Sequence, residues 1–169
     1  MKDVTDDGYR LFLDISRRNL LDQYWAGTCH CLDVLTEEQV WWRPNATSNS
    51  IGNLLLHLNG NVQQWLVAPL GGRAVERNRP AEFGEQGPIP VVELRERLAG
   101  TLKQVEGILS TVEPTALEKT YDIQNQRGVT GFEAIYHVVE HFSMHYGQIL
   151  YVTKLLTSQD LGFYRHLDK

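Results

Sequence analysis

Apolar residues recur at three- and four-residue spacing through four long segments, and no alternation of apolar and polar residues lasts long enough to indicate a strand. The pattern predicts helices over about residues 16–35, 50–67, 91–112 and 130–156. Each helix carries an apolar stripe, which it can bury against the stripes of the others. The sequence therefore predicts an all-α fold, a four-helix bundle with one shared core.

Local signals mark where some of these helices begin. Thr36 and Gln39 have the spacing of a capping box, which predicts a short helical turn after the first helix. Thr130 and Glu133 have the same spacing, so we place the start of the last helix there. In the third helix the interior Gly100 is a weak point, because glycine disfavours helix.

The longest predicted connection covers residues 71–90, where glycine and proline interrupt the chain. Loops of this length are usually functional or mobile, so we expect it to border a pocket. It does not mark a domain boundary, because two helices on either side cannot make a satisfactory core separately. We therefore expect residues 1–169 to form a single domain.

Composition and charge exclude several classes of protein. No apolar run approaches the roughly 20 residues that a bilayer span requires, so we expect no membrane partner. The N-terminus carries acidic residues where a signal peptide needs a basic stretch, so we expect a cytoplasmic protein. A formal net charge of −5 argues against nucleic acid, because phosphate binding needs a basic face.

Two small clusters invite a chemical interpretation. Cys29 and Cys31 point apart on a helix and have no second pair, so we interpret them as ordinary thiols. Arg73, Arg77 and Arg79 form a basic cluster in the middle loop. One interpretation is a solvated loop, and the other is a pocket rim that receives an acidic substrate.

Three histidines form the main candidate site. His141 and His145 fall one turn apart on the buried side of the last helix, and His57 lies in the inner half of the second. Imidazole suits zinc, nickel, copper or iron, and helical bundles build metal sites from facing helices. Three protein nitrogens leave one position open, as in catalytic zinc sites. The alternative is a set of hydrogen-bonded core histidines.

A second motif overlaps this site. His137 to His141 matches HxxEH, in which two histidines bind zinc and the glutamate is the general base of a metalloprotease. We disfavour it, because helical phase turns Glu140 toward solvent and no downstream carboxylate ligand is evident. We expect His137 to support the ligands from outside. Gln148 and Asn61 either orient a ligand or are ordinary polar groups of the core.

Two segments carry a family resemblance, SIGNLLLHLNGNVQQWL with His57 and EHFSMHYGQILYVTKLL with the His141-x3-His145-x2-Gln148 signature. They resemble the DinB-like superfamily, also called YfiT-like metalloenzymes, and the likeness covers nearly the whole chain. The resemblance implies a four-helix bundle with a long crossover connection, in which histidines at the three matching positions bind a divalent ion. It also implies a homodimer. The chain departs from the usual histidine or arginine of this signature at Tyr146.

Characterised members of that superfamily include transferases and isomerases that use low-molecular-weight thiols such as bacillithiol, mycothiol or glutathione. The resemblance therefore implies a metal-dependent thiol S-transferase holding zinc or nickel, with iron, manganese or copper as alternatives. Its substrate would be a small molecule, and Arg73, Arg77 or Arg79 would hold the carboxylates of the thiol. The competing hypotheses are a metal-binding stress or regulatory protein without turnover and a metal-dependent hydrolase. No catalytic residue is assigned.

Overall fold

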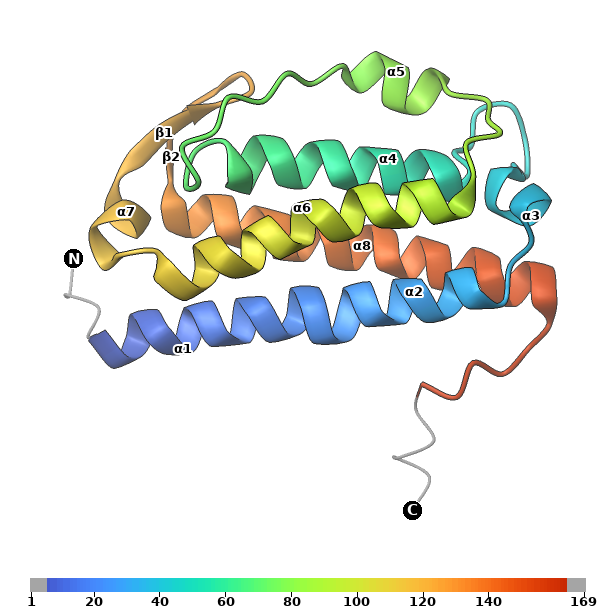
Figure 1. Cartoon of the computed structure of the whole chain (residues 1–169), viewed down its shortest axis with the longest axis horizontal. Coiled ribbons are helices and arrows are strands. Elements are labelled where there is room, and N and C mark those ends of the chain that lie inside the picture. Colours follow the sequence, from blue (N-terminus) through green and yellow to red (C-terminus); the bar gives the residue numbers. More distant parts are fainter. Residues whose placement is uncertain (1–5, 164–169) are drawn as a thin grey trace.

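The structure, a computed structural model, describes residues 6–163 and is mostly helical (Figure 1). Its long helical runs are α1 (Asp6–Arg17), continued by the π-helical η1 (Arg18–Trp25) and α2 (Ala26–Asp33); α4 (Ile51–Val62), continued by η2 (Gln63–Val67); α6 (Val91–Thr111); and α8 (Gly131–Thr157). The first run packs against α6 and α8, and α4 packs against the same two helices. The apolar stripes predicted from the sequence thus face a common interior.

The first helical run begins about ten residues earlier than the pattern predicted, at Asp6 instead of Ser16. Its first turns bury an apolar face near the start of α8, where the rings of Phe12 and Phe132 lie 5.1 Å apart. The same turns expose Leu11 and Ile15. Apolar residues recur at helical spacing through this stretch, so the signal was present in the sequence and the prediction placed the start too late.

Both predicted capping boxes are present. The Thr36 side chain accepts a hydrogen bond from the backbone N–H of Gln39, and the Gln39 side chain accepts one from Thr36, at the start of α3 (Glu37–Trp41). Thr130 and Glu133 make the same pair of bonds at the start of α8. These boxes satisfy backbone N–H groups that have no partner within their helices, so they fix where each helix begins.

The connection predicted over residues 71–90 is not irregular throughout, because it contains the short helix α5 (Arg79–Gly84). The Asn78 side chain caps α5 by accepting a hydrogen bond from the Ala81 N–H at 3.2 Å, and Pro80 stands in its first turn. Six residues are too few to show helical periodicity in a sequence. In Figure 1 this segment runs over the outer side of α4.

A small hairpin is the exception to a mostly helical fold, which otherwise agrees with the all-α prediction. After α7 (Pro114–Glu118), strands β1 (Thr120–Ile123) and β2 (Gln126–Thr130) pair antiparallel, so the described residues contain a two-stranded sheet. Each strand buries one side chain, Ile123 or Val129, which is too little alternation for the sequence to indicate a strand. In the tail after α8 Leu161 is buried, and residues 164–169 lie outside the described residues.

α4 is the most enclosed of the long helices, since only Leu56 and Asn59 among its residues are not buried. The long helices cover its inner side, and the segment with α5 covers its outer side. His57 lies on this helix and is therefore shielded from both directions. Within the described residues, no helix combines the length and apolar character needed to cross a membrane.

Candidate metal centre

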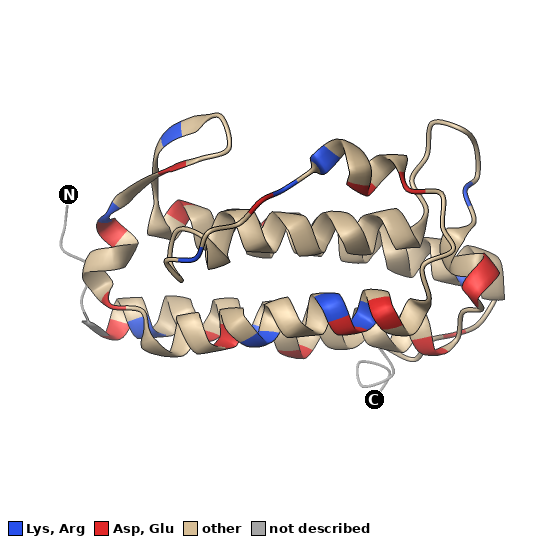
Figure 2. Ribbon diagram, turned by 45° about the horizontal axis from the view of Figure 1, so that its top comes forward, with Lys and Arg blue, Asp and Glu red and all other residues tan. Residues whose placement is uncertain are grey.

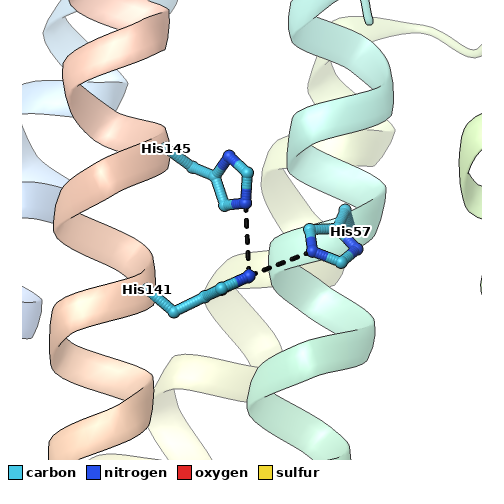
Figure 3. Close-up of side chains that lie close together, drawn as sticks. All are labelled: His57, His141 and His145. Carbon is cyan, nitrogen blue, oxygen red and sulfur yellow. Dashed lines mark hydrogen bonds between the residues drawn. The ribbon is translucent and has the colours of Figure 1, made fainter.

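His57 of α4 and His141 and His145 of α8 converge on one point between the two helices (Figure 3). Nε2 of His141 lies 3.1 Å from Nε2 of His57 and 3.2 Å from Nε2 of His145. One ring nitrogen from each histidine lies within 4.8 Å of the other two. The structure thus brings together the three histidines that the sequence singled out.

The outward nitrogens of two of these rings are held by oxygen acceptors. His57 Nδ1 lies 2.9 Å from Glu82 Oε2, and His145 Nδ1 lies 2.7 Å from Gln148 Oε1. Carboxylate and amide oxygens accept hydrogen bonds, so each Nδ1 carries the ring proton and donates a hydrogen bond through it. The Nε2 atom of each ring then presents a lone pair to the centre, the tautomer that a metal ligand requires.

Arg77 also approaches His57, with Nη2 at 3.1 Å from Nδ1. The same Nη2 lies closer to Glu82 Oε2, at 2.8 Å, and Arg77 Nε donates to Glu82 Oε1 at 2.7 Å. Because arginine only donates and an ionised carboxylate is the stronger acceptor, both the guanidinium and His57 Nδ1 donate to Glu82. The contact of Arg77 therefore does not reverse the tautomer of His57.

Burial favours the neutral forms of His141 and His145. It lowers the pKa of His141 to about 3, with further lowering from His145, His57, His137 and Arg77. Burial also lowers the pKa of His145, against the opposing effect of the hydrogen bond with Gln148. Neutral imidazoles have free lone pairs, and His141 Nδ1 is buried without a hydrogen-bond partner in the described structure. Without an ion, a proton on His141 Nε2 can bond to the Nε2 lone pairs of His57 and His145, and a divalent ion would replace that proton.

The residues present fit one divalent ion. Tetrahedral zinc with Zn–N bonds of 2.0–2.1 Å separates its ligand nitrogens by about 3.3–3.4 Å. The two Nε2 separations of 3.1 and 3.2 Å are close to that value, and the third pair of ring nitrogens lies within 4.8 Å. His57 and His145 are only 4% and 8% exposed, whereas His141 is half-buried. The three histidines can therefore hold a metal ion inside the helical core, with His141 the most exposed of the three.

Residues 9–164 match the model of a family described as a protein of unknown function, DUF1572. The chain belongs to the DUF1572 family. Its fold is similar to a crystal structure described as the conserved protein of locus from Enterococcus faecalis, with a TM-score of 0.67 and 17% identity over 86% of this chain and 97% of that one. Comparison with curated proteins gave no match.

One of the two interpretations considered from the sequence fails for Arg77 of this DUF1572 protein. Its side chain is 6% exposed, and besides Glu82 it donates to Gln64 Oε1 at 2.8 Å, so it is not a solvated loop residue. It is an internal partner of the site, and with other residues of its segment it lines a cavity of about 260 Å³ against α4, so the long connection borders a pocket as expected. Arg73 and Arg79 are exposed, and Arg79 lies over the Phe83 ring at 4.8 Å.

The HxxEH interpretation fails on geometry. Glu140 is exposed, as helical phase predicted. His137 Nε2 meets Asn61 Nδ2 at 3.1 Å, and its ring stacks on Trp65 with centroids 3.9 Å apart. Its contact with the three histidines of the DUF1572 site is a stack on His141, with centroids 5.3 Å apart. His137 thus flanks the site without a hydrogen bond to it.

Of the other residues near the three histidines in the sequence, one contacts the site and one does not. Gln148 orients His145, one of the two roles considered from the sequence. The ring of Tyr146 lies against Gly27 and Tyr24 in the first helical run, away from the three histidines. Sequence reasoning missed Glu82. Asn78 and Pro80 signal the start of the helix that carries Glu82. They do not indicate that Glu82 contacts His57, which lies 25 residues away along the chain.

Proposed function

We propose that this DUF1572 protein is a DinB-like metalloprotein, a single-domain four-helix bundle that binds one divalent ion, zinc or nickel first, through Nε2 of His57, His141 and His145. The observation that carries the proposal is the convergence of three nitrogens, two of which are held as lone-pair donors by Glu82 and Gln148. Three ligands also leave a coordination position open.

We further propose that the protein is an enzyme of the thiol S-transferase type. A bound divalent ion lowers the pKa of a thiol and stabilises the thiolate. Three neutral imidazoles leave the charge of such an ion uncompensated, and Arg77 offsets the charge of Glu82, so the site favours an anionic ligand. The thiol loses its proton to solvent, and a C–S bond forms to an electrophilic substrate as its leaving group departs with the bonding pair.

The half-buried edge of His141 is the side from which the thiol would approach. Because Arg77 is bound to Glu82 and Gln64, it is not free to hold a thiol carboxylate. The exposed Arg73 and Arg79 of the same segment remain candidates for that role. Burial lowers the pKa of the neighbouring His137, so this ring adds no positive charge that would compete for the anion near neutral pH.

Titration calorimetry of the zinc-loaded protein against glutathione, bacillithiol, mycothiol and cysteine tests this proposal. We expect at least one thiol to bind with a dissociation constant at or below about 1 mM, the range of ordinary substrate affinities. The metal-free protein and the His145→Ala variant serve as controls and should not bind that thiol. Zinc-loaded protein that binds none of the four would overturn the transferase assignment.

We propose a homodimer formed through the outward face of α8, which exposes large apolar side chains. Tyr136, Met144 and Tyr151 are 65%, 50% and 69% exposed, and their spacing places them on one side of the helix. Sedimentation equilibrium should give twice the chain mass of 19.3 kDa, and Tyr151→Glu should shift it toward one chain mass. Val92→Glu on α6, at a residue that is 60% exposed, is the matched control and should leave the dimer intact. Wild type at one chain mass would contradict the proposal.

A further inference from the structure

We propose that Glu82 and Arg77 act as one unit that positions His57 for the metal ion and sets the affinity of the site. The inference rests on the proposed metal site and assigns positioning roles to two residues outside it. Figure 2 shows its first basis: α4 carries no charged residue, whereas the segment that passes over it carries both signs of charge. The only charged side chains that contact His57 within the described structure therefore come from this segment.

The surface of α4 is shaped to receive the pair. Gly60 lies three residues after His57, and a Cβ atom there would stand 2.1 Å from Glu82 Oε1 and 2.8 Å from Arg77 Nε. These separations are far below van der Waals contact, so any side chain at this position would displace the carboxylate and the guanidinium. Glycine at position 60 lets both groups lie directly against the helix beside His57.

The backbone of the segment is anchored independently of this ion pair. Asn53 Nδ2 donates to the carbonyl oxygens of Glu82 and Glu85, at 2.9 Å each. Asn53 is itself fixed by its capping box with Ser50 at the start of α4. Arg43 donates to both Asn53 Oδ1 and the Glu85 carbonyl, at 2.8 and 2.7 Å. Glu82 is thus held by its backbone and by its side chain, which leaves the carboxylate little freedom.

The ion pair explains how a buried carboxylate can support a buried histidine without adding a net negative charge to the metal site. Glu82 is 9% exposed, and an unpaired carboxylate there would be strongly disfavoured. Arg77 contacts both carboxylate oxygens and is anchored in turn by Gln64. Glu82 therefore accepts a hydrogen bond from the Nδ1–H group of His57 and fixes the ring, while the pair as a whole adds no net charge to the metal site.

Two variants disturb the unit in different ways, and one control keeps its surroundings intact. Glu82→Gln retains an oxygen acceptor near His57 but removes the charge that holds Arg77. Gly60→Ala leaves both side chains present and displaces them by steric contact. Glu76→Gln, at an exposed residue of the same segment, is the matched control. We expect both test variants to lower zinc affinity by about 10- to 100-fold, as for other groups that support a ligand, and the control to stay within about twofold.

Zinc affinity is measured by competition with a chromophoric chelator, and thermal unfolding of the metal-free proteins shows whether each variant is folded. A second readout follows the His57 tautomer in metal-free protein by the ¹⁵N shifts of its ring. Wild type should show a protonated Nδ1 and a bare Nε2, and Glu82→Gln should shift toward a mixture of tautomers. A merely structural role would leave these shifts unchanged.

The outcomes separate this inference from the proposed function. Folded Glu82→Gln and Gly60→Ala proteins that bind zinc as tightly as wild type would overturn the positioning role and leave the metal site standing. A wild-type protein that does not bind zinc would overturn the proposed function and the inference with it. If one variant does not fold, the zinc affinity of the other decides between these outcomes, because each variant disturbs the same unit.

Discussion

Replacing His141 by alanine should remove most of the affinity for zinc, because His141 Nε2 lies between the Nε2 atoms of the other two histidines. Structural zinc sites with four ligands contribute roughly 10–16 kcal/mol, so one ligand is worth about 3–4 kcal/mol, on the order of a hundred- to a thousandfold in affinity. His57→Ala and His145→Ala should cause losses of the same order. Chelator competition measures the zinc affinity, and the visible spectrum of bound cobalt reports the ligand set.

The matched control is His137→Ala, which removes a histidine from the same face of α8. His137 stacks on His141 but bonds to Asn61, so its loss should change zinc affinity by no more than about tenfold, the lower end of what supporting groups contribute. Zinc should also raise the thermal midpoint of wild type and of this control, because it binds only the folded state. Alanine variants at all three ligand positions that keep wild-type zinc affinity would contradict the site.

The parts of the site that could be predicted are those set by one helix at a time. The four-residue interval between His141 and His145 places two rings on one side of any α-helix, and the Thr130 capping box fixes where that helix begins. His57 required more, namely the phase of a second helix and the family resemblance that pairs the two segments. Each of these signals is present in the amino-acid sequence, so the structure brings these side chains together as expected.

Glu82 and Arg77 show what the sequence could not supply. Their role depends on a six-residue helix lying against one turn of α4, and that placement is decided by contacts far apart in the chain. Charges between two glycine- and proline-rich stretches ordinarily predict a solvated loop. The deciding feature is Gly60, whose missing side chain makes room for the pair, and its importance is visible only once the segment is placed over it.

Glycine also underlies the second large effect, the destabilisation expected for Gly131→Ala. Gly131 is the first residue of α8, and a Cβ atom there would stand 2.6 Å from the Ala116 carbonyl oxygen and 2.7 Å from Leu117 Cα. Both neighbours belong to the backbone of α7, so no rotamer change can relieve the contact. We expect a loss of about 1–3 kcal/mol in the free energy of unfolding, the usual cost of overpacking, despite the higher helix propensity of alanine.

Gly100→Ala provides the control of opposite sign. Gly100 is exposed within α6, and a Cβ atom there meets nothing within 4 Å. Alanine should therefore raise the free energy of unfolding by about 0.5–1 kcal/mol, which tests the weak point predicted from the sequence. Urea denaturation of both metal-free variants measures the two changes. A Gly131→Ala protein as stable as wild type would contradict the prediction, since the α7 backbone would then shift with little loss of free energy of unfolding. His141 lies about 15 Å further along α8 at the usual helical rise, so we expect zinc affinity to be unchanged in the folded Gly131→Ala protein.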